Sequence, residues 1–199
     1  MRTEQPHIRS GRANQKERTR RAIVDAMRDL IANGAEATMP AAARAAQVSE
    51  ATAYRYFPDL ASLLREAIDS RWPRADEAMA PLADVTDPVR RIAYATEVLL
   101  RHVQHYQSAV RAMMSAAIVR PDLAGRRPGA RFGLIDSALA PLEGRTDPEV
   151  LAQLKLDLAV VVSAESLFTL TDLCGLSPEA AIASAIHTAR TLTSAVCAR

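Results

Sequence analysis

The chain has 199 residues, of which 49% are hydrophobic and 24% charged. This length and composition exclude a disulfide-stapled mini-protein, wholesale disorder and a collagen-like repeat. The net charge of +2 hides an uneven distribution: residues 1–74 contain 13 Lys/Arg against 9 Asp/Glu, a net of +4, whereas residues 75–199 contain 12 against 14, a net of −2. Because local charge determines what a surface binds, the basic N-terminal end is the place to look for an acidic partner.

Several classes of protein are excluded by what the sequence lacks. It has no run of 18 or more uncharged apolar residues, and no apolar core follows the basic N-terminus, so we expect neither a membrane span nor a signal peptide. Cys174 and Cys197 are too few for a disulfide framework and have no metal-ligand spacing. We therefore expect a cytoplasmic protein in a reducing setting.

The helical pattern begins after a polar, basic segment, residues 1–14, which we expect to form a flexible arm, with order beginning near Gln15. No window shows the alternation of a β-strand, which predicts an all-α fold. The first helix carries one apolar stripe at helical spacing, made of Ile23, Ala26, Met27, Leu30 and Ile31. Asn33-Gly34 is expected to end it.

Two short helices follow. Thr38 is a plausible N-cap and Pro40 is tolerated in a first turn, which predicts a helix over residues 39–46. After Gln47-Val48, Ser49 is placed to cap a third helix from Glu50 to about Tyr56. Two short helices joined by a three-residue turn form a helix-turn-helix.

Pro58 is expected to end the third helix and Asp59 to cap a fourth, with a domain boundary near residues 73–86 and a connection over residues 80–87. The sequence thus predicts a helix-turn-helix domain with a connecting fourth helix at residues 15–74 and a helical bundle at residues 75–199. A capping residue followed by proline recurs at Asp87, Asp147 and Ser177. The bundle's helices are predicted near residues 88–105, 107–119, 129–142, 148–174 and 178–197, and residues 120–129 as the most flexible interior connection.

A basic helix beside a helix-turn-helix indicates duplex DNA as the partner, since basic residues neutralise phosphates and the third helix can enter the major groove. Base contacts are expected from Glu50, Ala51, Thr52 and Arg55, because a carboxylate can accept from cytosine and a methyl group can meet the methyl of thymine. The full set of expected DNA-contacting residues is Arg18, Arg20, Thr38, Ser49, Glu50, Ala51, Thr52, Tyr54, Arg55 and Tyr56.

Residues 19–68 resemble the DNA-binding domain of the TetR family of transcriptional regulators. The matching residues are Arg21, Ile23, Ala26, Leu30, Gly34, Thr38, Ala42-Ala43, Ala46, Val48-Ser49, Thr52, Tyr54-Arg55-Tyr56-Phe57 and Leu63-Leu64. The resemblance implies a homodimer that places one recognition helix in each half of a palindromic operator. It also implies an inducer pocket in the C-terminal domain, movement of the fourth helix on ligand binding, and phosphate contacts from Thr38, Tyr54 and Tyr56.

The sequence departs from the family pattern at three positions. Gln47 stands where glycine is common, which predicts a residue at positive φ at a cost of about 1 kcal/mol. Leu60 replaces a frequent lysine, which removes one phosphate contact. Ala42 replaces a larger aliphatic residue, so a neighbouring side chain must fill the space.

Two interpretations remain open for the N-terminal arm and for the two tyrosines of the third helix. The arm is either a solvated tail or a minor-groove contact through Arg9 and Arg12. Tyr54 and Tyr56 are either helix-packing residues or phosphate contacts, and we favour the contacts, whereas Phe57 is expected in the core.

An effector pocket is sought among the bulky apolar and polar residues of the C-terminal half, which equally suit an ordinary core. The candidates are Trp72, Tyr94, His102, Tyr106, Met113, Met114, Phe132, Glu165 and Phe168. Glu165 lies in an apolar run, so its charge needs an arginine, a histidine or a polar ligand, unless it faces solvent or a dimer partner.

The last two helices carry the longest apolar faces, which either bury within one bundle or pair across a two-fold axis, as the resemblance implies. We favour pairing. The residues of these faces are Leu151, Leu154, Leu158, Val161, Val162 and Leu167 in one helix, and Ile182, Ala185, Ile186, Ala189, Leu192 and Val196 in the other.

The cysteines and histidines give no indication of a redox or metal site. The two cysteines are expected to be structural thiols, and His7, His102, His105 and His187 show no metal-ligand spacing, so neither metal nor cofactor is expected. The leading expectation is a DNA-binding transcriptional regulator and not an enzyme; that it is a dimeric, ligand-responsive repressor is what the family resemblance implies. A transcriptional activator of the same fold, or a helical ligand-binding or adaptor protein with weakened DNA binding, remains the alternative.

Overall fold

The computed structural model describes residues 7–69, 72, 74–119 and 130–198. Every regular element in these ranges is helical, which confirms the all-α prediction. By their contacts the described residues divide into two compact units, one within residues 1–71 and 108–125, the other within residues 72–107 and 126–199. Among the described helices, none combines the length and the apolar composition that crossing a bilayer requires.

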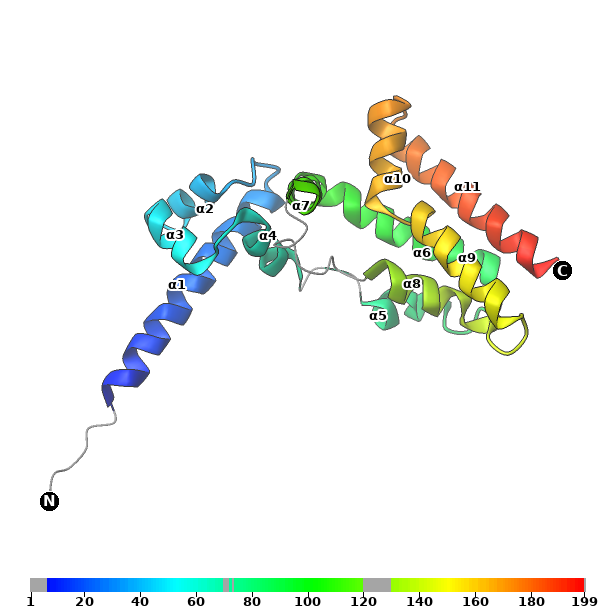
Figure 1. Cartoon of the computed structure of the whole chain (residues 1–199), viewed down its shortest axis with the longest axis horizontal. Helices are drawn as coiled ribbons and strands as arrows, with labels where there is room; N and C mark the ends of the chain where they lie inside the picture. Colours follow the sequence, from blue (N-terminus) through cyan, green and yellow to red (C-terminus); the bar gives the residue numbers. More distant parts are fainter. Residues whose placement is uncertain (1–6, 70–71, 73, 120–129, 199) are drawn as a thin grey trace, which may run out of the picture. The chain divides into compact units, whose positions relative to one another are not determined.

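The first unit contains four helices that we call the head: α1 (His7–Ala32), α2 (Met39–Ala45), α3 (Glu50–Tyr56) and α4 (Leu60–Asp69) (Figure 1). In the head α1 packs against α2 and α4, and α2 packs against α3. The apolar stripe of α1 supplies the core, in which Ile23 and Met27 are fully buried with Leu63, Leu64 and Phe57. Most of α7 (Gln107–Val119) belongs to the same unit.

Helix α1 begins earlier than expected. The prediction that order begins near Gln15 is wrong, because α1 already begins at His7. Residues 12–18 are mostly long, unbranched helix formers, and each residue added to an existing helix gains a hydrogen bond without a new nucleation step. Gly11 opposes this extension by only about 1 kcal/mol. Residues 1–6 of the predicted arm lie outside the described residues.

The second unit is a helical bundle. Its longest helices are α6 (Pro88–His105), α9 (Pro148–Val161) and α11 (Pro178–Cys197), and α11 packs along both α6 and α9. The predicted caps are confirmed: the side chains of Asp87, Asp147 and Ser177 accept hydrogen bonds from backbone N–H groups of the first turns. The shorter elements are α5 (Ala75–Met79), η1 (Ala80–Leu82), α8 (Ala130–Leu139), η2 (Ala140–Leu142), α10 (Ala164–Phe168) and η3 (Thr169–Leu173).

Two predictions for this unit are wrong. The expected helix over residues 148–174 is interrupted at Val162-Ser163, where the Ser163 hydroxyl accepts from Ser166 N at 3.0 Å and caps α10. A serine offers the backbone this alternative hydrogen bond, and the preceding valines are weak helix formers. The expected connection before Asp87 contains η1, in which Pro81 occupies the first turn and Leu82 is buried. The expected loop at 120–129 lies outside the described residues.

The apolar faces expected to pair between two copies are partly covered within one chain. Leu154, Leu158 and Ile182 are each at most 2% exposed, because α9 and α11 pack against each other and against α6. These three residues are therefore covered within one chain, whereas Val161, Ile186, Leu192 and Val196 of the same faces are half-buried, and pairing of the two helices across a two-fold axis stays a prediction. The apolar residues that α9 leaves exposed are Leu156 and Val160, at 61% and 72%.

Candidate nucleic-acid interface

The helix-turn-helix is built by side-chain caps at each helix start. The Thr38 hydroxyl accepts from Ala41 N at 3.3 Å and begins α2, with Pro40 in the first turn, as predicted. The Ser49 hydroxyl accepts from Thr52 N at 3.2 Å and begins α3. Each cap satisfies an N–H group that the helix itself leaves unpaired. The two helices therefore begin where their capping residues place them.

The turn between them contains the departure from glycine predicted at Gln47. Its φ is 55°, the one positive value among the described non-glycine residues. This conformation crowds the Cβ atom and is unfavourable for any residue other than glycine. The turn keeps its geometry because Val48 N bonds to Ala43 O at 2.9 Å and the flanking helices are packed.

α3 presents one face to the core and the other to solvent. Ala53 is fully buried and Phe57 is 1% exposed, which confirms Phe57 as a core residue. The small Ala53 side chain lets α3 lie close to the helices beneath it. Tyr54, in contrast, is 49% exposed, and Arg55 beside it is exposed. The outer face of α3 is therefore available to a partner.

The sequence-predicted contact residues differ in exposure. Ser49, Glu50, Ala51, Tyr54, Arg55 and Arg18 are exposed, and Thr38, Thr52, Tyr56 and Arg20 are half-buried. The Thr38 hydroxyl uses its oxygen in capping, so its proton remains able to donate to a phosphate. The Arg55 guanidinium lies 5.7 Å from the centroid of the Tyr56 ring and adds positive charge at the C-terminal end of α3. Hydroxyl and guanidinium donors with this exposure suit the phosphates of a duplex.

Arg20 is engaged within the head. Its guanidinium pairs with both carboxylate oxygens of Glu66 and donates from Nη1 to the Tyr56 carbonyl oxygen at 3.2 Å. Sequence reasoning placed Arg20 among the DNA contacts and did not single out Glu66. No local pattern could have found this pair, because its members lie on different helices, 46 residues apart in the chain.

A capped helix-turn-helix with an exposed, donor-rich second helix defines a DNA-binding head of a transcriptional regulator. The family model described as bacterial regulatory proteins, tetR family, matches residues 23–67, which span the C-terminal part of α1, all of α2 and α3, and most of α4. Residues 23–67 thus form a DNA-binding domain similar to that of the tetR family, which supports a DNA-binding transcriptional regulator. Neither a curated protein nor a solved structure matches the chain significantly.

The second unit brings three of the predicted effector residues together. The Trp72 and His102 rings lie 4.8 Å apart between centroids, and the His102 and Tyr106 rings 4.6 Å apart. Trp72 Nε1 and His102 Nε2 are buried and have no hydrogen-bond partner in the described part of the chain. Burial, with a smaller contribution from His105, lowers the pKa of His102 to about 4. His102 is therefore neutral at physiological pH.

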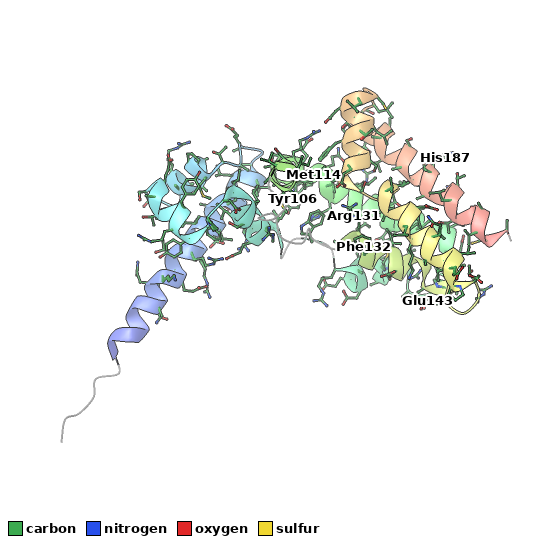
Figure 2. All side chains as sticks on the ribbon, viewed as in Figure 1. Tyr106, Met114, Arg131, Phe132, Glu143 and His187 are labelled. Carbon is green, nitrogen blue, oxygen red and sulfur yellow. The ribbon has the colours of Figure 1, made fainter. Side chains whose placement is uncertain are left out.

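The other predicted effector residues are dispersed. Phe132 lies in the first turn of α8, next to Arg131, which was not among the predicted residues (Figure 2). Arg131 Nη2 lies 3.3 Å from Glu165 Oε2, so an arginine supplies the partner that Glu165 was expected to need. Phe132 is 54% exposed and Phe168 is buried. The remaining candidates are Tyr94, half-buried on α6, and Met113 and Met114, half-buried on α7 in the first unit.

The cysteines and histidines form no metal-binding group in the described residues. Cys174 and Cys197 are both exposed free thiols. Within the described ranges, no group of three or more His, Cys, Asp or Glu residues could hold a metal ion.

Proposed function

We propose that the protein is a homodimeric repressor that binds a palindromic operator through α3 and is released by a small-molecule effector. The observation that carries the proposal is the outer face of α3, where exposed Tyr54 and Arg55 follow a capped, small-residue helix start. Small residues allow the helix to approach the floor of the major groove, while the donors at its far end meet phosphates.

The proposed division of labour on α3 follows from residue chemistry. Tyr54, Tyr56 and Thr38 donate hydroxyl protons to phosphates, which sets the register of the head on the duplex. Glu50 and Thr52 face base edges and read sequence, Glu50 by accepting from cytosine and Thr52 through its methyl group. Ser49 donates to the Thr52 hydroxyl at 2.9 Å, which favours one orientation of that side chain.

A dimer is favoured by the exposed apolar pair on α9. Leu156 and Val160 are separated by four residues and so share one face of the helix. Their burial against a second copy would remove apolar surface from water, which is the main driving force of association. Two heads related by a two-fold axis would then meet half-sites about one helical turn of DNA apart.

An effector site is favoured by the cluster of Trp72, His102 and Tyr106. Buried polar atoms without partners are destabilising, and a bound ligand that accepts from Trp72 Nε1 and pairs with His102 Nε2 would satisfy them. Because His102 is neutral, the cluster suits an uncharged, planar ligand with an oxygen acceptor. We propose DNA binding in residues 15–74 and effector binding and dimerisation in residues 75–199, with Trp72 of the cluster belonging to the effector-binding unit.

The experiment that tests the function is selection of duplexes from a randomised pool by the full chain, followed by titration of an enriched duplex at several salt concentrations. We expect an inverted-repeat consensus and an affinity that falls steeply with salt, because phosphate contacts release counterions. Enrichment of no sequence, together with salt-independent binding, would contradict the proposal.

A further inference from the structure

Arg20 connects three elements of the head. From α1, its Nε donates to Glu66 Oε1 on α4 at 2.9 Å, and its Nη2 pairs with Glu66 Oε2. Its remaining nitrogen, Nη1, donates to the carbonyl oxygen of Tyr56, the last residue of α3. The guanidinium carbon also lies 4.4 Å from the centroid of the Phe57 ring. The planar guanidinium thus binds α3 and α4 at the same time.

Arg20 contacts α3 at a backbone carbonyl group of the C-terminal end of the helix. The last carbonyl groups of a helix have no partner within the helix and carry partial negative charge. A guanidinium at this end therefore satisfies an acceptor and stabilises the helix end. Tyr54, Arg55 and Tyr56, the donors proposed to meet DNA, all lie in the last turn that this contact holds.

α4 is held by α1 at a second position. Arg28 Nε donates to the Ala67 carbonyl oxygen at 3.0 Å, one residue beyond Glu66. Arg20 and Arg28 are eight residues apart, about 12 Å along α1. Arg28 makes this contact near the C-terminal end of α4, whereas Arg20 also reaches α3. A displacement of α4 would therefore move Arg20 and disturb its hydrogen bond to the end of α3.

We propose that Arg20 is a positioning residue for DNA binding: together with Glu66, it holds the C-terminal turn of the recognition helix in place and links that turn to α4. This inference rests on the proposed use of α3 as the recognition helix. It replaces the phosphate contact that the sequence suggested for Arg20. The pair is only partly buried, with 37% and 39% of the two side chains exposed, so its contribution to overall stability is modest.

A matched pair of variants tests the role. Glu66→Ala removes the partner of Arg20, and Glu17→Ala removes the partner of Arg21, which pairs with Glu17 at 2.9 Å on the exposed face of α1. Both variants remove one negative charge from the head and break one arginine–glutamate pair. The loss of a negative charge should therefore increase the attraction to DNA equally in both variants. Only Glu66→Ala also frees Arg20, the residue that holds the end of α3.

Titrations use a duplex enriched by the wild-type chain, at a temperature at which circular dichroism shows every variant folded. We expect Glu17→Ala to bind at least as tightly as wild type and Glu66→Ala about fivefold or more weakly. Arg20→Lys keeps the charge but not the fork of donors, so it should also lose affinity. The double variant Arg20→Lys with Glu66→Ala should bind DNA no more weakly than the weaker-binding single variant, because both substitutions disrupt the same Arg20–Glu66 pair.

The salt dependence separates positioning from phosphate contact. We expect Arg20→Gln to weaken binding while the slope of log affinity against log salt stays as in wild type; loss of a phosphate contact would reduce its magnitude by about 0.9. A reduced slope, or equal affinities of Glu66→Ala and Glu17→Ala, would overturn the inference and leave the proposed function standing. If the wild-type chain enriches no duplex, the proposed function fails and the inference fails with it.

Discussion

Arg91 on α6 donates from Nη2 to the backbone carbonyl oxygen of Ser137 on α8 at 2.8 Å. The same guanidinium donates to the carbonyls of Leu82, Val85 and Ala138, and the residue is 8% exposed. Arg91 therefore holds the end of η1, the segment that follows η1 and the end of α8 against the first turn of α6. A cation suits this place because the last carbonyls of a helix carry partial negative charge.

Substitution of Arg91 should destabilise the second unit. Arg91→Met keeps much of the side-chain volume but leaves several carbonyl groups without a donor, so we expect a loss of about 2–4 kcal/mol in the free energy of unfolding. Chemical denaturation measures this, with Arg90→Met on the exposed side of α6 as the control. Equal stability of the two variants would contradict the role assigned to Arg91.

The turn of the helix-turn-helix should gain stability from glycine. Gln47→Gly removes the Cβ atom from a residue at φ 55° and should raise the free energy of unfolding by about 1 kcal/mol. Gln47→Ala, which keeps a Cβ atom, should give no such gain. Thermal denaturation followed by circular dichroism compares the three proteins, and a melting temperature of Gln47→Gly at or below that of wild type would show that the turn is unstrained.

His102 should make stability depend on pH. Its pKa is about 4 in the folded chain against 6.5 ordinarily, so the unfolded state binds more protons between these values. Stability from this group is therefore fully present above about pH 6.5 and falls as the pH drops toward 4. His102→Phe should remove this part of the dependence, whereas His187→Gln, an exposed control, should keep it. Nuclear magnetic resonance titration that places the midpoint of His102 near 6.5 would contradict its burial.

The exposed apolar pair on α9 should control assembly. Light scattering of the wild-type chain should give about twice the monomer mass of 21.6 kDa, and Leu156→Arg with Val160→Asp should give the monomer mass. Ile118→Asp, at a residue 70% exposed on α7, serves as the control and should stay dimeric. A monomeric wild-type chain would refute the proposed dimer, and a dimeric double variant would place the interface elsewhere.

Local signals predicted the helix starts well. Thr38, Ser49, Asp87, Asp147 and Ser177 cap helices as expected, because a cap is a bond between residues two or three positions apart. The all-α fold and the start of α3 could therefore be predicted from the sequence.

What the sequence did not reveal depends on contacts between distant residues. The Arg20–Glu66 pair joins two helices, and neither residue has a local pattern that identifies the other. The break at Ser163 was missed because the apolar run around it continues at helical spacing while the serine hydroxyl competes for the backbone. The burial of Leu154, Leu158 and Ile182 within one chain was not predicted, because periodicity shows that a face is apolar but not which surface covers it.

The central claim, that α3 is the DNA-reading helix, is tested most directly by titrating the enriched duplex with Tyr54→Phe/Tyr56→Phe. The variant keeps both rings and removes only the two hydroxyl groups, so the head should stay folded. Two lost hydrogen bonds to phosphates, at about 1 kcal/mol each, predict an affinity roughly 10- to 30-fold weaker than wild type. An affinity equal to that of wild type would contradict the claim.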